Sequence, residues 1–329
     1  MKAMVTTQYG PPDLLQLREV ATPTPAQDEV LIKLYASSVN PLDSFVIRGP
    51  LFSVPVIGRL LKPKHKIAGA DIAGRVESVG RDVKQFRPGD EVFGASFGKR
   101  GLGGFAEYAC AVEDSLARKP ANLSFAEAAA VPVAAITALQ GLRDKGEIQR
   151  GQKVLIDGAS GGVGTFAIQI AKSFGAEVTA VCSPRNVDRA RSIGADHVID
   201  YTREDFTHSG LRYDLILGAN VHHSIFDYRR ALNRNGIFVV AGGSVMRLLQ
   251  AVLLAPLLSR IGSRKTRFFI AKINAKDLAI LKDLLEAGKV VPVIDRRYPL
   301  GEVSEALRYR EEGHAQGKIV ITVNHSPED

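Results

Sequence analysis

The stretch VLIDGASGGVGTFAIQIAK, residues 154–172, places a strand, a glycine-rich turn and a helix in immediate succession. Its apolar start, Val154–Ile156, has the length and composition of a buried parallel strand. Glycines in the turn permit a tight bend and a close approach to phosphate, and the following helix N-terminus offers free N–H groups. Glycine turns also occur for conformational reasons alone. A second apolar strand, Glu177–Cys182, follows at the right distance and favours a dinucleotide-binding unit over a plain strand–helix turn.

Composition limits the classes of protein that fit this chain. Its 329 residues exceed one typical core and predict two domains. The two cysteines, Cys110 and Cys182, cannot form a disulfide framework, so we expect a reducing, cytoplasmic location. The net charge of +8 is spread along the chain and suits an anionic cofactor without specifically indicating nucleic acid. No signal peptide is expected before the strand-like N-terminus, and no apolar run is long enough to span a bilayer.

The pattern of predicted elements changes along the chain. Residues 1–124 show short strands separated by Gly, Pro and Asp turns, which is typical of a β-rich, barrel-like unit. From residue 125, strand and helix candidates alternate, which predicts a parallel sheet covered by helices. The tail returns to strand-like sequence at 290–293 and 319–323, around a helix at 302–311. We therefore predict a discontinuous β-rich domain (1–124 and 273–329) with a cofactor domain (125–272) inserted into it.

Several motifs carry a family resemblance that covers essentially the whole chain. The segments GADIAGRVESVG (69–80) and FRPGDEVFG (86–94) resemble the signature of medium-chain dehydrogenases/reductases. Val39–Asp43 and Ala130–Ala134 are similar to the quinone oxidoreductase branch, especially to enone and alkenal reductases. The resemblance implies an α/β protein with a GroES-like catalytic domain and a doubly wound Rossmann domain. It also implies a cofactor turn made by Ser160, Gly161, Gly162, Val163 and Gly164, with Thr137, Gly242, Gly243 and Ser244 along the cofactor.

The chain departs from the zinc-dependent alcohol dehydrogenases of that family. Their Gly-His-Glu is here Gly69-Ala70-Asp71, and their cluster of four cysteines is missing. Catalytic zinc requires three protein ligands and structural zinc four. The scattered histidines, among them the adjacent His222 and His223, do not supply them. We expect no metal site.

The residues after the second strand of the cofactor domain indicate the cofactor. NAD-binding units carry an acidic residue there to bond the ribose 2′-OH. This strand instead ends in Val181-Cys182-Ser183-Pro184-Arg185, and Ser183 and Arg185 are suited to hold a 2′-phosphate. The alternative for Arg185 is a solvated loop charge. The missing acid, together with Ser183 and Arg185, favours NADPH over NADH. Tyr201 resembles a family tyrosine that closes the adenine-ribose pocket.

Reduction of a polarised C=C bond or a quinone depends less on a Lewis acid than alcohol oxidation does: NADPH delivers hydride to an electrophilic carbon, and hydrogen-bond donors stabilise the resulting oxygen charge. Asn40 is the candidate donor, although capping the turn before Pro41 explains it equally well. Asp43 is expected to orient this segment, with Arg48 as a candidate partner. The family's arginine, however, usually stands where this chain has Ile47. Lys318 resembles a family position near the cofactor cleft, and an edge-strand charge is its alternative explanation.

The segment Val245–Arg267 is apolar at first and basic at its end. It is too short and too interrupted to span a bilayer, yet too apolar to be left in water. One alternative is a helix or helix pair that lines the cleft beside the nicotinamide or a homodimer interface. The other is a peripheral membrane contact, with apolar side chains embedded and basic residues at the headgroups.

Two functions follow from the sequence. The first is an NADPH-dependent oxidoreductase that transfers hydride, without zinc, to quinones or to the C=C bond of α,β-unsaturated carbonyls, with small apolar carbonyl or quinone substrates. The second is an NADPH-binding accessory protein at a membrane surface or on nucleic acid, with little turnover. The segment 40–43 favours the first function, and the segment 245–267 is the main support for the second.

Overall fold

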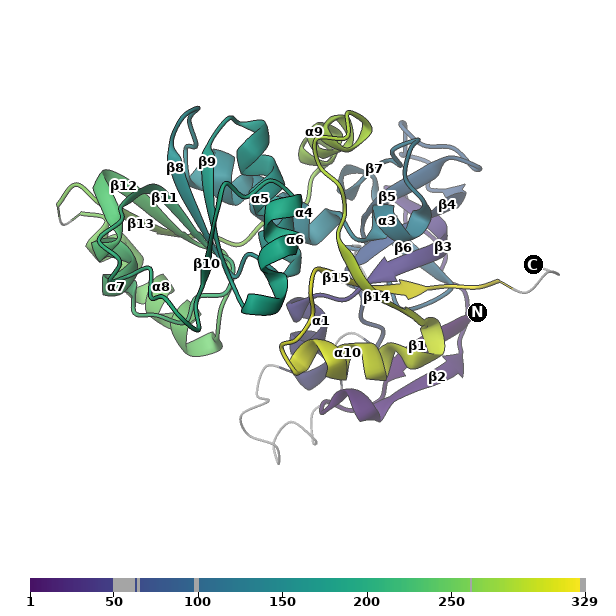
Figure 1. Ribbon diagram of the computed structural model, residues 1–329. Helices are drawn as coiled ribbons and strands as arrows, with labels where there is room; N and C mark the ends of the chain where they lie inside the picture. Colours follow the sequence, from purple (N-terminus) through teal and green to yellow (C-terminus); the bar gives the residue numbers. More distant parts are fainter. Residues whose placement is uncertain (50–62, 64–65, 98–100, 261, 326–329) are drawn as a thin grey trace. The chain divides into compact units, whose positions relative to one another are not determined.

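The computed structural model of the protein describes residues 1–49, 63, 66–97, 101–260 and 262–325. Two compact units make up the chain (Figure 1). Unit 1 consists of Met1–Val133, Ile273–Glu286 and Ile294–Asp329, and unit 2 of Ala134–Lys272 and Ala287–Val293. Both units are therefore discontinuous, and the predicted segment 273–329 of the β-rich domain gives up residues Ala287–Val293 to unit 2.

The first change of unit lies after Val133 rather than after residue 124. The reason is helix α3 (Phe125–Ala129), which packs against strands of unit 1. Ser124 caps this helix in a capping box with Glu127. The Phe125 ring stacks on Tyr35, with ring centroids 4.6 Å apart. A sequence pattern that turns helical at 125 therefore does not mark the start of the second unit.

Unit 1 is built on a mostly antiparallel sheet of seven strands, centred on the long strand β3 (Glu29–Ser38). The strand order is β14-β15-β3-β4-β5-β7, and β6 pairs with β3. A separate two-stranded sheet joins β1 to β2. The bounds are β1 (Lys2–Thr6), β2 (Leu15–Glu19), β4 (Asp71–Val79), β5 (Glu91–Ala95), β6 (Tyr108–Val112), β7 (Leu116–Arg118), β14 (Ile294–Pro299) and β15 (Lys318–Thr322).

Three further helices belong to unit 1: α1 (Pro41–Arg48), α9 (Ala275–Glu286) and α10 (Val303–Glu311). The predicted strand at 290–293 is wrong, because the strand in this part of the chain is β14, which pairs in parallel with β15. The core of the unit is apolar and centred on β3, whose Val30, Ile32 and Leu34 are fully buried. This rigid sheet positions the chain segments that begin or end at β3, β4 and β15.

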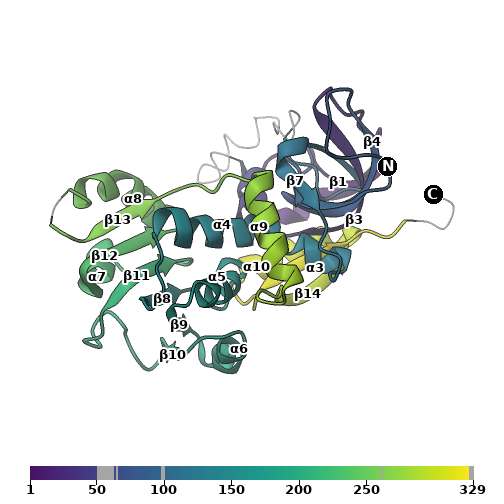
Figure 2. The ribbon, with the colours of Figure 1, turned by 90° about the horizontal axis from the view of Figure 1, so that it is seen from above.

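Unit 2 contains a six-stranded, wholly parallel sheet in the order β10-β9-β8-β11-β12-β13. The strand order reverses between β8 and β11, as in a doubly wound dinucleotide-binding fold. Helices lie on both sides of the sheet (Figure 2). The strands are β8 (Lys153–Asp157), β9 (Glu177–Cys182), β10 (His197–Asp200), β11 (Tyr213–Gly218), β12 (Leu232–Val240) and β13 (Lys265–Phe268). The helices are α4 (Pro132–Gln140), α5 (Gly162–Ser173), α6 (Val187–Ser192), α7 (Ile225–Arg230) and α8 (Val245–Leu258).

The predicted fold class, a GroES-like β-rich domain with a Rossmann domain, is confirmed by these two units. None of the helices in the part of the chain that the structure describes is long and apolar enough to cross a membrane.

Candidate functional site

The glycine turn of unit 2 joins β8 directly to helix α5. Gly158 adopts a φ of 78°, which favours glycine, and a Cβ on Gly164 would overlap the carbonyl oxygen of Gly158. Gly161 is the N-cap residue of α5, and a Cβ there would meet only the Gly158 carbonyl oxygen, at an ordinary contact distance of 3.6 Å. The first backbone N–H groups of α5, from Gly162 onward, have no partner within the helix by its geometry. No acidic residue stands in that first turn, so the turn is suited to bind an anion.

The other residues predicted to bind the cofactor follow parallel strands of the same sheet. Ser183 follows β9, Tyr201 follows β10, and Gly242-Gly243-Ser244 follow β12. The carboxyl ends of parallel strands share one edge of a sheet, which is where doubly wound proteins bind dinucleotides. A Cβ on Gly242 would overlap the carbonyl oxygen of Ala219, so this glycine allows two loops of that edge to meet. Thr137 is buried in α4 of the same unit, and its place beside the cofactor stays a prediction.

Ser183 and Arg185 lie in a short turn directly after β9. The Ser183 hydroxyl accepts a hydrogen bond from the Asn186 amide at 2.8 Å and keeps its own hydrogen for another partner. Arg185 is exposed, which agrees with a phosphate contact and with a solvated charge alike. The carboxylate of Asp200, which lies opposite Cys182 in β10, accepts hydrogen bonds from the backbone and hydroxyl of Thr202. The turn after β9 thus carries hydroxyl and guanidinium donors and no acid.

Sequence reasoning missed a polar cluster at the same edge, formed by Asp157, His222 and Tyr228. The Tyr228 hydroxyl donates to the buried Asp157 carboxylate, and the His222 ring nitrogen Nδ1 lies 3.6 Å from it. Burial raises the pKa of Asp157 to about 6. The half-exposed His222 ring faces Tyr201, with centroids 6.5 Å apart. The sequence feature that could have predicted this cluster is Asp157, an acidic residue at the last position of β8, just before the glycine turn. Tyr201 thereby belongs to an aromatic pair.

Unit 1 contains a buried polar network around the predicted residues Asn40 and Lys318. The Lys318 ammonium donates to Asn40 Oδ1 at 2.7 Å and to Asp71 Oδ2 at 3.0 Å. Asn40 Nδ2 donates to the same Asp71 oxygen at 2.8 Å, and Ser38 Oγ donates to it at 2.6 Å. The other Asp71 oxygen accepts the backbone N–H of Val133. Exposed fractions of 2 % for Asn40, 0 % for Asp71 and 3 % for Lys318 make this a desolvated ion pair with a fixed amide.

This network excludes one explanation of Lys318 and shows how the Asn40 side chain is oriented. Lys318 is not an edge-strand charge, because β15 lies between β14 and β3. The Asn40 amide has one favourable orientation, since a flip would set its NH₂ against ammonium and its oxygen against carboxylate. One Nδ2 hydrogen is taken by Asp71, and the other makes only a long bond of 3.4 Å to the Ser38 carbonyl. Asn40 also stands at the N-cap of α1, but its side chain is directed to Asp71 and Lys318.

Asp43 is fully buried and organises the start of α1. Its carboxylate accepts the backbone N–H of Asn40 at 2.7 Å and that of Gly69 at 3.1 Å. Burial outweighs these two donors and raises the pKa of Asp43 to about 7. The expected partner Arg48 is wrong, because its guanidinium pairs with Glu311 at 2.6 Å. Asp43 therefore orients Asn40 through the backbone.

The position that carries histidine in the zinc enzymes is occupied by the fully buried methyl group of Ala70. Among the residues that the structure describes, no group of three or more His, Cys, Asp or Glu side chains could hold a metal ion. Metal independence stays a prediction that experiment must test.

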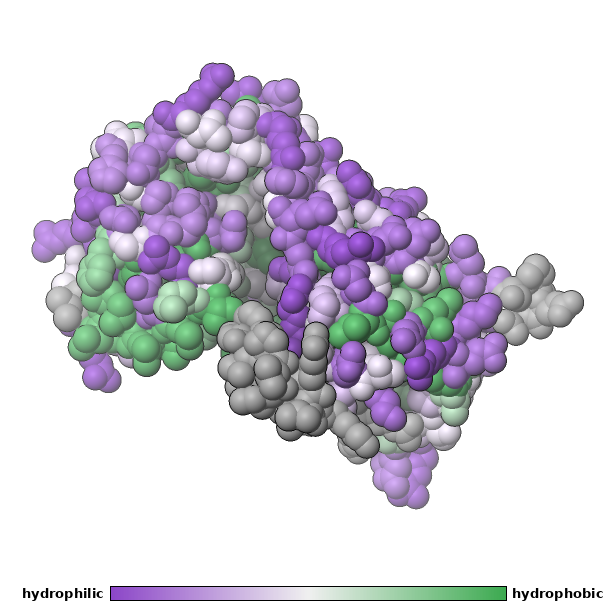
Figure 3. All heavy atoms as spheres, turned by 90° about the horizontal axis from the view of Figure 1, so that it is seen from below, coloured by the Kyte–Doolittle hydropathy of each residue, from purple (hydrophilic) through white to green (hydrophobic). Residues whose placement is uncertain are grey.

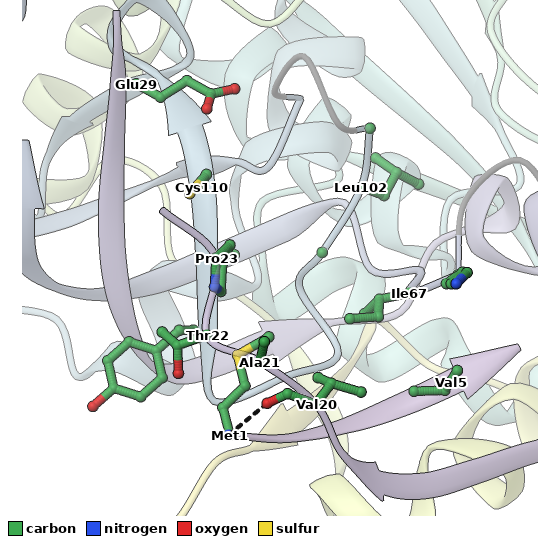
Figure 4. Close-up of a pocket in the computed structure, with 15 residues that line it drawn as sticks. Met1, Val5, Val20, Ala21, Thr22, Pro23, Glu29, Ile67, Leu102 and Cys110 are labelled. Atoms are coloured by element: carbon green, nitrogen blue, oxygen red, sulfur yellow. Dashed lines mark hydrogen bonds between the residues drawn. The ribbon is translucent and has the colours of Figure 1, made fainter. Parts of the chain in front are cut away.

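Unit 1 also contains a pocket of about 490 Å³ that is open to solvent and lined mainly by apolar side chains such as Met1, Val20, Ile67 and Leu102 (Figure 4). Cys110 is also in its wall, and the N-terminal amino group donates to the Val20 carbonyl there. None of the predicted site residues lines this pocket. It therefore plays no part in the site proposed for this chain.

Comparisons with known proteins agree with both units. The family model described as the alcohol dehydrogenase GroES-like domain matches residues 26–121, and the one described as zinc-binding dehydrogenase matches residues 193–321. A tomato (Solanum lycopersicum) 2-methylene-furan-3-one reductase is 39% identical, over 98% of this chain and 79% of the relative. The chain belongs to the medium-chain dehydrogenase/reductase family. Within that family it falls in the quinone and enone reductase branch, and it is an oxidoreductase.

Two further comparisons support the same placement. An Arabidopsis thaliana protein named NADPH-dependent alkenal/one oxidoreductase, chloroplastic, is 35% identical, over 98% of this chain and 79% of its own. The solved structure of a quinone oxidoreductase from Coxiella burnetii has a TM-score of 0.86 at 31% identity and covers 98% of this chain and 99% of its own. The resemblance inferred from the sequence motifs is confirmed.

Proposed function

We propose that this chain is an NADPH-dependent reductase of quinones or of the C=C bond of α,β-unsaturated carbonyls. The observation that carries the proposal is that one chain contains both a Rossmann glycine turn, in unit 2, and a buried amide–ammonium–carboxylate network, in unit 1. The relatives are named for an NADPH-dependent alkenal/one reaction, a furanone reduction and a quinone reduction. The predicted substrate is a small apolar carbonyl compound or quinone.

The residues of unit 2 fit a phosphorylated dinucleotide. The open N-terminus of α5 and the crowded glycines Gly158 and Gly164 suit a pyrophosphate, because side chains at these glycines would displace the backbone. Ser183 and Arg185 would hold a 2′-phosphate, and the absence of an acid after β9 removes the partner that NADH would need. Tyr201 and His222 present exposed rings at the same edge, suited to stack against a base.

The chemistry assigned to the chain's own residues is electrostatic. NADPH, when bound, supplies the hydride. Reduction of an enone or a quinone places negative charge on an oxygen, and a fixed donor stabilises that charge better than mobile water. We propose Asn40 Nδ2 as that donor, since its second hydrogen makes only a long bond to Ser38. Lys318 and Asp71 hold the amide in its orientation, and Asp43 fixes the backbone beneath it.

Location and further partners stay proposals. The chain has only two cysteines, too few for a disulfide framework, which supports a reducing compartment such as the cytoplasm. Named relatives are chloroplastic or mitochondrial, so subcellular fractionation must decide. Binding to nucleic acid is not proposed, because the positive charge is not gathered in a nucleic-acid motif.

A spectrophotometric screen tests the proposed function. The purified protein is incubated with NADPH and a panel of enals, enones and quinones, and loss of the nicotinamide absorbance is followed. We expect turnover with at least one of these electrophiles and with none of the matching saturated alcohols. An NADPH-binding accessory protein would bind the cofactor and oxidise it with no member of the panel, and that result would overturn the proposal.

A further inference from the structure

Helix α8 differs from an amphipathic surface helix because its outer side is apolar as well as its inner side. Such helices bury their large apolar side chains and expose polar ones. In α8 every exposed position is apolar, and Val245, Met246, Leu249, Val252, Leu253 and Leu257 have exposed fractions between 47 and 74 %. These six residues, the α8 apolar face, recur at helical spacing and form one stripe. The 14-residue helix makes the stripe about 20 Å long.

The opposite side of α8 already packs against its own unit. Ala251, Ala255 and Leu258 are buried there, and Ala251 and Leu258 belong to the apolar cluster that contains Phe238 and Val240. Ser244 caps the N-terminus by accepting the backbone N–H of Arg247. The helix is therefore anchored by its inner side and cannot bury the α8 apolar face by rolling over. The expectation of a helix pair is wrong, since a single helix covers Val245–Leu258.

A basic group of residues follows the helix. Residues 244–269 contain five Lys and Arg residues and no Asp or Glu. Arg267 forms a salt bridge with Glu147. Arg260, Arg264 and Lys265 form no salt bridge within the described part of the chain, and Arg260 and Lys265 are exposed. Hydrophobic side chains gather on the side of unit 2 that carries α8 (Figure 3). An exposed apolar stripe of this size marks an interaction site.

We propose that the α8 apolar face binds the surface of an anionic lipid bilayer, with Arg260, Arg264 and Lys265 at the headgroups. The helix lies in the interface plane, its apolar side chains enter the acyl boundary, and the basic residues pair with lipid phosphates. This inference does not depend on the proposed reductase activity.

Charge decides between a membrane and a second copy of the chain. Two copies that pack through this face would bring together Arg260, Arg264 and Lys265 of each copy, and residues 244–269 contain no acid to pair with them. Like charges at a protein interface are costly. An anionic bilayer offers both an apolar layer and a dense negative surface, so it matches the two halves of the segment. The homodimer predicted from the sequence becomes the competing outcome of the test.

Flotation with vesicles tests the proposal. The wild-type protein is mixed with vesicles of phosphatidylcholine alone or of phosphatidylcholine with phosphatidylglycerol, and the floated fraction is measured at low and high salt. We expect flotation with the anionic vesicles, weaker at high salt because screening reduces the attraction. Leu253→Ser with Leu257→Ser should lower the partition coefficient by roughly tenfold per residue. Replacing Arg260, Arg264 and Lys265 by Ala should lower it by roughly fivefold per charge.

Matched variants control for general effects of hydrophobicity and charge. Phe226→Ser removes an apolar side chain of similar exposure from helix α7. Replacing Arg212, Arg234 and Lys289 by Ala, all exposed residues of unit 2, removes the same charge elsewhere. Both controls should float like the wild type, and circular dichroism should show all variants folded.

The proposal is overturned if the wild type fails to float with anionic vesicles, or if the α8 variants float as well as their controls. A dimer in sedimentation that Leu253→Ser with Leu257→Ser converts to monomer, with no flotation of the wild type, would assign the face to a second copy.

Discussion

At the scale of single residues, the site depends on the fixed orientation of the Asn40 side chain. The amide is held by an ammonium on one side and a carboxylate on the other, all within the protein interior. The sequence pointed to Asn40, Asp43 and Lys318 individually. It did not show that Asp71 connects two of them, because residues 40, 71 and 318 meet only when β3, β4 and β15 pair.

Replacement of Asn40 by Ala should lower kcat/KM for an enone or quinone by about 100-fold, because it removes a preorganised donor to the developing oxygen charge. The dissociation constant for NADPH should stay unchanged, since Asn40 belongs to unit 1 and the glycine turn to unit 2. Steady-state kinetics and a binding titration measure the two quantities. Asn122→Ala is the control, because Asn122 also belongs to unit 1 and bonds only a backbone carbonyl of α9 at 3.0 Å. Equal loss of activity in both variants would contradict the assigned role.

We predict that Ser183 and Arg185 determine the preference for NADPH over NADH. NADPH should bind at least about 10-fold more tightly than NADH, which corresponds to about 1.4 kcal/mol. Arg185→Ala should remove most of this difference by weakening NADPH alone, because guanidinium pairs with phosphate and not with a ribose hydroxyl. Calorimetric titration of both cofactors gives the values, with Arg212→Ala as the exposed-arginine control. Equal affinities of the wild type for the two cofactors would refute the assignment.

Asp43 should give the protein a measurable pH dependence of stability. Its pKa is raised to about 7 in the folded state, so the folded chain binds a proton between about pH 4 and 7 where the unfolded chain does not. The free energy of unfolding contributed by this group therefore falls as pH rises through that window. Relative to Asp43→Asn, the wild type should lose roughly 2 kcal/mol between about pH 5 and 8. Urea unfolding at the two pH values measures the difference, and a difference that stays constant or grows with pH would exclude the raised pKa.

At the scale of elements, the strand–turn–helix unit at 154–172 was the most predictable part of the molecule. The apolar run, the glycines and the helical spacing all agreed, and β8 and α5 lie where they were expected. Strands whose bounds depend on pairing with residues far away in the sequence were harder to predict. The strand predicted at 290–293 is displaced to β14 because pairing with β15, rather than local apolar character, selects it. Tertiary pairing overrides local β propensity in this way.

The glycines of the turn should differ sharply in tolerance. Gly164→Ala should cost about 2 kcal/mol of unfolding free energy or more, because the new Cβ overlaps the backbone of Gly158 and Ala159. Gly161→Ala should be mild, since its Cβ would meet only the Gly158 carbonyl oxygen at 3.6 Å. Denaturant unfolding and NADPH titration of the two variants compare them. Similar stabilities would show that the turn relaxes and that the glycine spacing is not required.

At the scale of the whole molecule, motif spacing was enough to predict two units and the family. The exact boundary between the two units could not be predicted, because the sequence of α3 is helical but this helix packs on the sheet of unit 1. The role of Val245–Arg267 was also open, since a sequence does not show which side of a helix faces its own unit. The structure shows that Leu248, Leu254 and Leu258 pack against the core of unit 2, whereas the α8 apolar face is exposed.

The central claim is hydride transfer from NADPH to a conjugated carbon, and isotope transfer tests it most directly. The chelator-dialysed protein is incubated with NADPH deuterated at the transferable position and a simple enone, and the product is analysed by mass spectrometry. The account predicts a saturated ketone that carries deuterium at the β-carbon, formed without added metal. An allylic alcohol deuterated at the carbonyl carbon, or transfer that returns only when zinc is added, would contradict it.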